Sequence, residues 1–512
     1  LESNKDRNDA VDLLIRIDQF LRTSPRSAAL FQLLKKDQLK LSIAKKIQAT
    51  GGSGPICCSS AWSPCSPSPS SQRPHGKSIT AWQRAAFPAW AKLSPQERGA
   101  ILHKVADNIE AHIEELAQLE THDNGSLLRS HRRGVMPRVV MNIRYFADYA
   151  MNDLKHPEFE TRGHTNHVTW DPSGVAVIIT PWNAPLMLAT WRIGPALASG
   201  DTVVLKPPEW APLTASYFAQ LAHEAGLPAG VFNVVQGFGI EAGAPLTENP
   251  DVSRICFTGS VPTAKAVARA AAENLIPCSF ELGGKSPTVI LDDADLDLAV
   301  ELAIEQYDNA GQVCLAGTRL LVQKGIAEAF AAKFAERAAQ IKQGDPRDEE
   351  TQIGPNIHLK HVERVTGFIE RAKKDGATIA YGGEVNTALG THYIKPTLVI
   401  DAPAGSEILT QEVFGPVLTM QTFDTDDEGL ALANGTEFGL AACVVSGNRE
   451  RAEAFTKFLV AGTIWVNCFF VRDLSAPFGG SKRSGIGREG GLWSFDFYAD
   501  VKNTVFAPNG WK

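Results

Sequence analysis

The feature that most restricts the fold is a regular alternation of short apolar runs with helical patterns, which begins at Val175. A first series contains the runs VAVIIT, DTVVLKP, VFNVVQG and RICFTGS, each followed by apolar residues at helical spacing. A second series contains PTVIL, TRLLVQ, AACVVSG and GTIWVN. Short apolar runs that alternate with helices are typical of a parallel sheet covered on both faces. We therefore predict an α/β chain with two doubly wound parallel-sheet domains.

Residues 1–75 differ in composition from the rest of the chain. Residues 51–74 read GGSGPICCSSAWSPCSPSPSSQRP, and this density of Ser, Pro and Gly predicts a loop or a disordered tract. We assign residues 1–75 no function. Regular structure is predicted from Thr80, and Ser94 followed by Pro95 has the pattern of a helix N-cap and first turn.

Composition and charge favour a small-molecule partner. Hydrophobic residues make up 44% and charged residues 21%, as in an ordinary soluble protein, and a net charge of −7 argues against nucleic acid. The longest apolar run, residues 174–191, contains two prolines and an asparagine, which favours a buried strand and a turn over a membrane span. The cysteines do not form a scaffold pattern and the N-terminus lacks a signal-peptide layout, so we expect the cytoplasm.

The stretch NAGQVCLAG (309–317) places Cys314 between two glycines. Such a cysteine can be a small core residue, a metal ligand, a disulfide partner or a nucleophile. A reducing compartment argues against a disulfide, and no neighbouring ligands support a metal. His358 and His361 in HLKH also lack a third ligand, so we expect no metal site. Four further cysteines lie in apolar runs and are expected in the core: Cys256, Cys278, Cys443 and Cys468.

Two polar side chains follow strand-like runs. Asn183 in TPWNAP can donate its amide to a developing oxyanion, although an asparagine there is also a common turn former. Glu281 in SFELGGKSP can act as a general base if burial raises its pKa, although glutamate beside glycines is also common in loops.

Two other strand ends suit a nucleotide. Gly259 and Ser260 end one run just before an alanine-rich helix, whose N-terminus favours an anion such as a pyrophosphate; an ordinary capped turn is the alternative. Lys206 and Glu209 follow another run, where a carboxylate can bind ribose hydroxyls and repel a 2′-phosphate, favouring NAD over NADP. The alternative is a surface ion pair. The glycines from Gly237 to Gly243 depart by one residue from the dinucleotide fingerprint.

Together these segments resemble the NAD(P)-dependent aldehyde dehydrogenase superfamily, from about Thr80 to Ala507. The matching motifs, in the family's order, are TPWNAPL, LKPPE, FTGS, FELGGKSP, GQVCLAG, QEVFGPV and PFGGSKRSGIGREGG. The resemblance implies that Cys314 is the nucleophile, Glu281 the general base and Asn183 the oxyanion-stabilising amide. It implies NAD as the cofactor, with contacts from Trp182, Lys206, Glu209, Gly259, Ser260, Glu412 and Phe414.

The resemblance also implies a domain plan. An NAD-binding domain would comprise residues 76–151 and 172–283, and a catalytic domain residues 284–478. Residues 152–171 and 495–508 would form a small oligomerisation hairpin and its partner strand in a homodimer or homotetramer. The chemistry would be oxidation of an aldehyde to a carboxylic acid through a cysteine thiohemiacetal and thioester, with a depressed thiol pKa at Cys314.

Arg138 and Arg472 stand in settings similar to those of muconic-semialdehyde dehydrogenases, where arginines hold the substrate's carboxylate. We therefore expect a substrate such as 2-hydroxymuconic semialdehyde. Structural ion pairs are the alternative for the arginines, and an aromatic or aliphatic aldehyde without a carboxylate is the alternative substrate. An enzyme that transfers the acyl group to coenzyme A, and a catalytically silent relative, are rival functions.

Two features depart from the family pattern. Residues 1–75 contain no recognisable counterpart of the family's N-terminal segment. The interval from Glu281 to Cys314 is about one residue shorter than usual, which predicts an altered helix end before the nucleophile.

Overall fold

The computed structural model describes residues 75–509, which belong to one compact unit spanning Ser68–Lys512. The prediction of a loop or disordered tract at 51–74 lies outside the described residues. Helix α4 (His75–Ala91) begins five residues before the expected start at Thr80. Among the described residues, no helix is both long enough and apolar enough to cross a membrane.

A six-stranded sheet has the strand order β17-β7-β6-β3-β4-β5, and only β17 runs antiparallel to its neighbour. Its strands are β3 (Val175–Ile179), β4 (Thr202–Lys206), β5 (Phe232–Val234), β6 (Arg254–Gly259), β7 (Cys278–Leu282) and β17 (Gly485–Ile486). Successive side chains of β3 enter different cores: Ala176 and Ile178 join one hydrophobic cluster, whereas Val175 and Val177 join another. Both faces are apolar because helices cover both.

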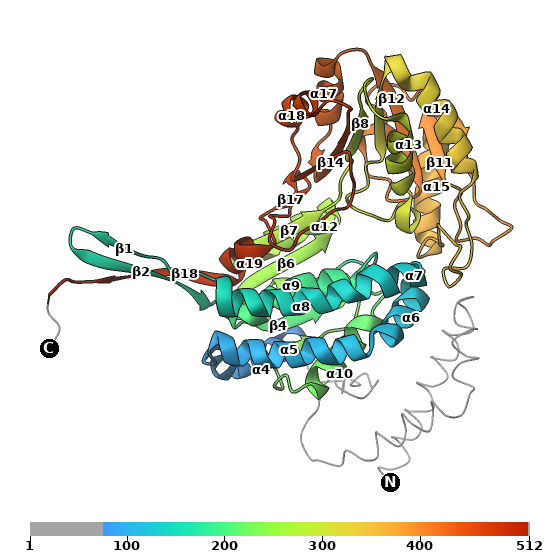
Figure 1. The fold of residues 1–512 in the computed structure, drawn as a ribbon. Coiled ribbons are helices and arrows are strands. Elements are labelled where there is room, and N and C mark those ends of the chain that lie inside the picture. Colours follow the sequence, from blue (N-terminus) through green and yellow to red (C-terminus); the bar gives the residue numbers. More distant parts are fainter. Residues whose placement is uncertain (1–74, 510–512) are drawn as a thin grey trace, which may run out of the picture. The chain divides into compact units, whose positions relative to one another are not determined.

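The helices around this sheet are α5 (Pro95–Ala111), α6 (Ile113–Asn124), α8 (Met136–Asp148), α9 (Pro185–Ser199), α10 (Leu213–Glu224) and α12 (Val261–Ala272) (Figure 1). The predicted cap of α5 is confirmed: Ser94 accepts from the Glu97 N–H, and the Glu97 carboxylate accepts from the Ser94 N–H. The helical pattern continues beyond Ala111 in the sequence, but α5 ends there and α6 begins after His112.

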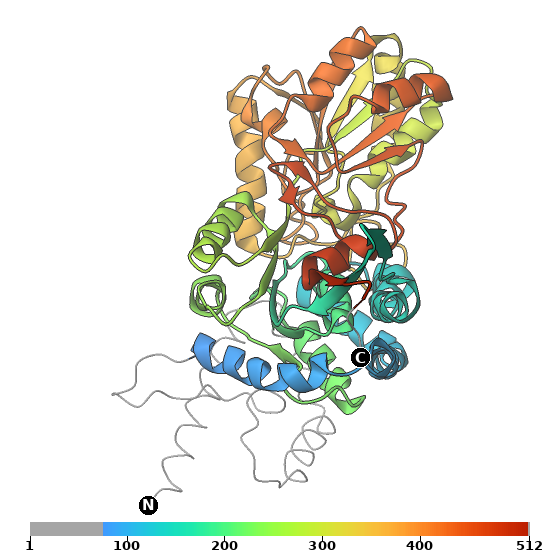
Figure 2. The same ribbon diagram turned by 90° about the vertical axis from the view of Figure 1, so that its left-hand side faces the viewer.

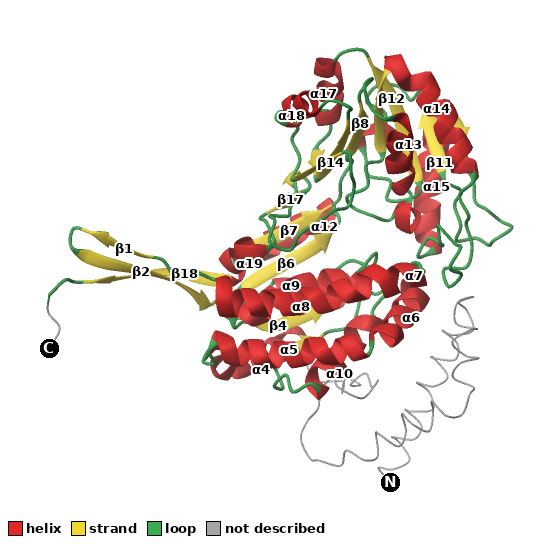
Figure 3. Cartoon of the chain, viewed as in Figure 1, coloured by secondary structure: helices red, strands yellow, loops and turns green. Residues whose placement is uncertain are grey.

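A second, seven-stranded sheet has the order β10-β11-β12-β9-β8-β14-β15, with only β10 antiparallel. Its strands are β8 (Pro287–Ile290), β9 (Arg319–Gln323), β10 (Thr378–Tyr381), β11 (Thr397–Ile400), β12 (Val417–Phe423), β14 (Ala441–Val445) and β15 (Thr463–Val466). Its main helices are α13 (Leu296–Glu305), α14 (Lys324–Ala339), α15 (Leu359–Lys374), α17 (Asp426–Asn434) and α18 (Arg449–Thr456). Figures 2 and 3 show helices on both sides of the strands, so the predicted two doubly wound sheets are confirmed.

A third sheet has three antiparallel strands, β1 (Glu158–Thr161), β2 (His164–Pro172) and β18 (Ala499–Phe506), and extends away from the six-stranded sheet (Figure 1). It contains the expected hairpin and C-terminal strand. The start of the expected hairpin segment, residues 152–153, belongs instead to a π-helical turn, and residues 495–498 belong to α19 (Gly491–Tyr498).

The cysteine placement was mostly predicted. Cys256 lies in β6 and Cys443 in β14, both buried, and Cys278 begins β7. The strand position expected for Cys468 is wrong, because β15 ends at Val466 and Cys468 follows it in a loop, where it packs, partly buried, against a hydrophobic core cluster.

Candidate active site

Cys314 follows an unusual backbone turn. Helix α13 ends at Glu305, and a short 3-10 helix, η4 (Asp308–Gly311), follows with positive φ at Asn309 (49°), Ala310 (56°) and Gly311 (69°). The approach to the nucleophile is thus a left-handed stretch, and whether it differs from the family pattern stays a prediction. Glycine is required at 311, because a Cβ there would lie 2.0 Å from the Gly415 carbonyl oxygen.

Asn183 lies against the same loop. Its side-chain Nδ2 donates to the Gln312 carbonyl oxygen at 3.0 Å, two residues before Cys314. Its own carbonyl oxygen accepts from the Asn309 Nδ2 at 3.2 Å. Because a primary amide carries two N–H groups, Asn183 can keep its bond to Gln312 and donate a second one.

Glu281 lies near the end of β7, only 4% exposed, where it pairs in register with Gly485 of β17. Burial raises its pKa well above the ordinary value, and the nearby Glu489 raises it further, against lowering by Arg192, Arg472 and Arg488. The raised pKa that the sequence analysis required of Glu281 is therefore present. The motif PFGGSKRSGIGREGG supplies β17, Arg488 and Glu489, so it surrounds Glu281.

The expectation of a depressed thiol pKa is wrong for this structure. Burial raises the pKa of Cys314 to about 12. Arg472 lowers it, Glu412 and Glu281 raise it, and Arg192 lowers it. Burial outweighs the two guanidinium groups because removing water disfavours the thiolate, and the two carboxylates add to that effect.

The two strand ends proposed for nucleotide binding have the expected local structure. Lys206 ends β4, and its Nζ lies 3.1 Å from the Glu209 Oε2. The ion-pair alternative is thus present, but the lysine side chain is only 4% exposed, so this is not a pair on the open surface. Gly259 ends β6, and Ser260 caps α12 by accepting from the Thr263 N–H at 3.4 Å.

Aromatic rings connect the two larger sheets beside these residues. The Trp182 ring centre lies 5.3 Å from that of Phe414 and 5.1 Å from that of His361. Trp210, which follows Glu209, stacks on His358 at 4.8 Å with an angle of 6° between the rings. His361 therefore contacts the cofactor-site candidates Trp182 and Phe414, whereas His358 contacts Trp210, the neighbour of Glu209. No group of three or more His, Cys, Asp or Glu side chains suited to a metal occurs within residues 75–509.

Sequence reasoning considered His361 only as a metal ligand and did not single out Trp210. The His361 Nε2 lies 2.7 Å from the Phe414 carbonyl oxygen, and burial lowers its pKa to about 4, so the ring is neutral at pH 7. The available signals were the position of Trp210 next to Glu209 and the spacing of the two histidines on one face of a helix start.

Glu412 reaches the glycines that follow Glu281. Its Oε1 accepts from the Gly284 N–H at 3.0 Å, and burial raises its pKa to about 7. A Cβ on Gly283 would lie 2.0 Å from the Glu412 Oε2, so only glycine leaves room for this carboxylate. Arg364 holds the Glu412 segment by donating to the carbonyl oxygens of Glu412 and Val413.

Arg138 and Arg472 come together around one tryptophan. Arg138 lies on α8, and its guanidinium carbon is 5.2 Å from the Trp191 ring centre, while that of Arg472 is 4.7 Å from the same ring and 4.0 Å from Phe478. The Arg472 Nε is buried and has no hydrogen-bond partner within the described residues. Burial lowers the pKa of Arg472 to about 10, and the nearby Cys314 is the largest opposing influence.

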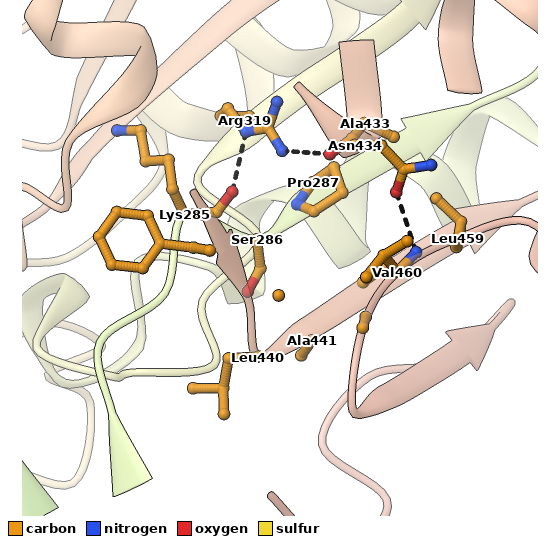
Figure 4. A pocket seen from close by; sticks show the side chains of 14 residues that line it. Lys285, Ser286, Pro287, Arg319, Ala433, Asn434, Leu440, Ala441, Leu459 and Val460 are labelled. Carbon is orange, nitrogen blue, oxygen red and sulfur yellow. Dashed lines mark hydrogen bonds between the residues drawn. The ribbon is translucent and has the colours of Figure 1, made fainter. Parts of the chain in front are cut away.

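A small cavity lies beside the FELGGKSP stretch, among residues of β8, β9 and β14 (Figure 4). Arg319 donates to the carbonyl oxygens of Lys285 and Ala433, and the Lys285 amine points away from the cavity (Figure 4). The cavity volume of about 10 Å³ is room for one water, so it is neither a cofactor site nor a substrate site.

A model of the aldehyde dehydrogenase family matches residues 67–504. The chain is 42% identical over 428 residues to a 2-hydroxymuconic semialdehyde dehydrogenase of Pseudomonas sp. strain CF600, covering 81% of this chain and 87% of that protein. It is 39% identical over 427 residues to the 2-aminomuconic semialdehyde dehydrogenase of Homo sapiens, covering 82% and 88%. The solved structure of a Staphylococcus aureus betaine aldehyde dehydrogenase in complex with NAD+ matches with a TM-score of 0.82 at 36% identity, covering 85% and 88%. In sequence and in fold, the chain belongs to the aldehyde dehydrogenase family and is an enzyme of that class.

Proposed function

We propose that this enzyme oxidises a carboxylate-bearing semialdehyde to a dicarboxylic acid, with NAD as the oxidant and Cys314 as the nucleophile. The observation that carries the substrate class is the buried, unpartnered Nε of Arg472 beside Cys314, with Arg138 near it. A guanidinium without a carboxylate partner, placed against aromatic rings, is suited to bind a carboxylate on the substrate.

The groups at the carboxyl edge of the six-stranded sheet fit a dinucleotide. Lys206 and Glu209 would bind the adenosine ribose, and the N-terminus of α12 would face the pyrophosphate. The remaining cofactor contacts in this proposal come from Trp182, Gly259, Ser260, Glu412 and Phe414. On this basis the six-stranded sheet with its helices is the cofactor domain, and the seven-stranded sheet with its helices is the catalytic domain.

The proposed reaction begins when the Cys314 thiol passes its proton to the Glu281 carboxylate and from there to solvent. The resulting thiolate attacks the aldehyde carbon and a C–S bond forms. The carbonyl oxygen becomes an oxyanion, which accepts from the Asn183 amide and from the Cys314 backbone N–H. The nicotinamide of NAD would supply the hydride acceptor, and loss of hydride from the thiohemiacetal carbon, with its oxygen returning to a carbonyl, would leave a thioester on Cys314. Glu281 takes a proton from water, the resulting hydroxide attacks the thioester on Cys314, and the C–S bond breaks to give the carboxylic acid and a thiolate, which takes the proton back from Glu281.

The substrate proposal is tested by comparing kcat/KM for 2-hydroxymuconic semialdehyde and benzaldehyde in the wild type and Arg472→Ala. We expect a wild-type preference for the semialdehyde of about a hundredfold, most of which the variant loses, because one buried charge-assisted contact contributes on the order of 2–3 kcal/mol. The exposed Arg133→Ala is the control. Equal preference in the wild type and in Arg472→Ala would contradict the proposal.

An aldehyde without a carboxylate is the second candidate. The Trp191 and Phe478 rings, 6.1 Å apart and edge to face, give the two arginines apolar surroundings that also suit an aromatic substrate. The benzaldehyde measurement decides between the two. Transfer to coenzyme A is disfavoured by Glu281, whose proposed task is to activate water, and NADH formation strictly dependent on coenzyme A would reverse this assignment. A silent relative would form no NADH with any aldehyde.

The assembly and the compartment also remain proposals. We infer a homodimer or homotetramer formed through the β1–β2–β18 sheet, supported by exposed apolar side chains on that sheet. The described cysteines are free thiols, which supports a reducing compartment such as the cytoplasm.

A further inference from the structure

The left-handed approach to Cys314 is held by hydrogen bonds from Asn309. Its φ and ψ are 49° and 37°, and those of Ala310 are 56° and 35°. L-residues with a Cβ adopt this region at a free-energy cost, and such conformations persist where the surroundings determine them. Asparagine tolerates the region better than most residues, so its backbone preference alone is one explanation for its presence.

The side chain of Asn309 has a second role, because both of its polar atoms are bonded. Its Oδ1 accepts from the Ser126 Oγ at 2.9 Å, and Ser126 lies just beyond the end of α6. Its Nδ2 donates to the carbonyl oxygen of Asn183 at 3.2 Å. The amide therefore joins the loop after β3 to a third segment of the chain.

A second pair of bonds closes this arrangement into a ring. The Asn183 Nδ2 donates to the Gln312 carbonyl oxygen at 3.0 Å, and the Gln312 Nε2 donates to the Asn309 carbonyl oxygen at 2.9 Å. Gln312 is only 1% exposed, and its Oε1 also accepts from the Ile357 N–H at 3.0 Å. Asn183 is thus fixed at its backbone by Asn309 and at its side chain by Gln312.

We propose that Asn309 is a positioning residue that sets the location of the Asn183 amide relative to Cys314, and so the strength of oxyanion stabilisation. This inference rests on the proposed roles of Asn183 and Cys314. The physical reason is that an oxyanion donor is effective only when it is held at hydrogen-bond distance from the place where charge develops. Asn309 contacts neither the aldehyde nor the cofactor in this proposal and acts only through Asn183.

The test is a double-mutant cycle with Asn309→Gly and Asn183→Ala. Asn309→Gly keeps a backbone that adopts the left-handed region but removes both side-chain bonds. We expect it to lower kcat about tenfold or more, with KM for NAD unchanged. Asn183→Ala should lower kcat by about a hundredfold or more, and the double variant should be no slower than Asn183→Ala alone.

Controls separate positioning from folding. Ser126→Ala removes only the hydrogen bond from the Ser126 Oγ to the Asn309 Oδ1. It should give a smaller loss of kcat, and this loss should also disappear in the Asn183→Ala background. NADH titration by fluorescence should give the same Kd within about twofold for every variant. The exposed Asn274→Gly makes the same chemical change elsewhere and should leave kcat unchanged.

The outcomes distinguish the inference from the function on which it rests. If Asn183→Ala lowers kcat but the effects of the two substitutions multiply, the positioning role of Asn309 is overturned and the role of Asn183 stands. If Asn183→Ala keeps the wild-type kcat, the proposed oxyanion role fails and the inference fails with it. If Asn309→Gly does not yield folded protein, a double-mutant cycle of Ser126→Ala with Asn183→Ala decides instead. Effects on kcat that multiply overturn the positioning role, and a Ser126→Ala effect that vanishes in the Asn183→Ala background supports it.

Discussion

Arg192 and Glu489 form an ion pair inside the protein, with 3.0 Å between the Arg192 Nε and the Glu489 Oε1 and side chains only 2% and 6% exposed. Both charges act on the proposed general base: Glu489 raises the pKa of Glu281, and Arg192 lowers it. The pair therefore contributes, after burial, to the pH at which Glu281 loses its proton.

We predict that Glu489→Gln shifts the acid limb of the kcat profile to lower pH by roughly one unit, because Glu281 then ionises more easily. The profile between pH 5 and 9 measures the shift, with the exposed Glu453→Gln as the control. The melting temperature should fall, since Arg192 is left buried without its partner. A limb that stays in place or moves to higher pH would show that Glu281 does not control this step.

A second buried carboxylate, Glu120 on α6, accepts from the Thr214 Oγ at 2.7 Å and from the Leu186 N–H at 3.4 Å. Burial raises its pKa to about 7 despite these bonds. Because the folded-state pKa lies above the unfolded value, the stability from Glu120 is present below about pH 4.5 and is lost as the pH rises through about 7. The neighbouring His131, whose pKa burial lowers to about 4, stays neutral over this range.

Glu120→Gln should therefore gain stability relative to the wild type as the pH rises from 5 to 8, by on the order of 3 kcal/mol. Melting temperatures of both proteins at the two pH values measure the change, and the surface variant Glu273→Gln is the control. A constant difference between variant and wild type would refute the prediction.

Glu209 is predicted to govern the choice between NAD and NADP. Glu209→Gln removes the negative charge that repels a 2′-phosphate and releases Lys206 from its 3.1 Å ion pair. We expect kcat/KM with NADP to rise about tenfold and kcat/KM with NAD to fall. Glu224→Gln, at the end of α10, is the control, because it makes the same charge change away from the strand end and should leave the cofactor preference unchanged. Unchanged cofactor preference would remove Glu209 from the site.

Gly283 is predicted to be necessary for cofactor binding. An alanine there would force the Glu412 carboxylate to move, because the new Cβ would lie 2.0 Å from its Oε2. We expect Gly283→Ala to raise KM for NAD about tenfold or more. Gly239→Ala, where a Cβ meets no atom within 4 Å, is the matched control. An unaffected KM would indicate that Glu412 does not contact the cofactor.

The exposed apolar side chains of the three-stranded sheet predict an interface between copies of the chain. Val501 and Val505 of β18 are 53% and 54% exposed, and Phe159 of β1 is 51% exposed. Val505→Lys should reduce the assembly to a smaller species, measured by sedimentation velocity, because a charge buried at an apolar interface is costly. Leu275→Lys, at a leucine 88% exposed elsewhere, should leave the sedimentation unchanged.

The positions of the site residues along the chain were predictable because they depend on local patterns. Asn183, Lys206, Gly259 and Glu281 were each identified by a strand-like run that precedes or contains them, and the strands β3, β4, β6 and β7 lie there. The parallel pairing of these strands places their carboxyl ends along one edge. Cys468 was misplaced because an apolar run alone does not show where a strand ends.

Long-range contacts were not predictable in the same way. The hydrogen bond between Asn309 and Ser126 spans 183 positions of the chain, and that between Asn309 and Asn183 spans 126. The stack of Trp210 on His358 joins the turn after β4 to the start of α15. From the sequence, HLKH could be considered only as a weak metal-binding motif, because a sequence shows the spacing of two histidines but not the aromatic rings that surround them in the fold.

The sequence by itself determined the α/β class, the helix caps at Ser94 and Ser260, and the chemical types at the proposed site, since each follows from neighbouring residues. Only the tertiary structure decided the ionisation of those groups. The pKa of the Cys314 thiol is raised to about 12, and that of Glu281 is also raised, because folding removes water from both and brings other charged residues near them. A pKa depends on burial and on charges from distant segments, and neither is encoded in local spacing.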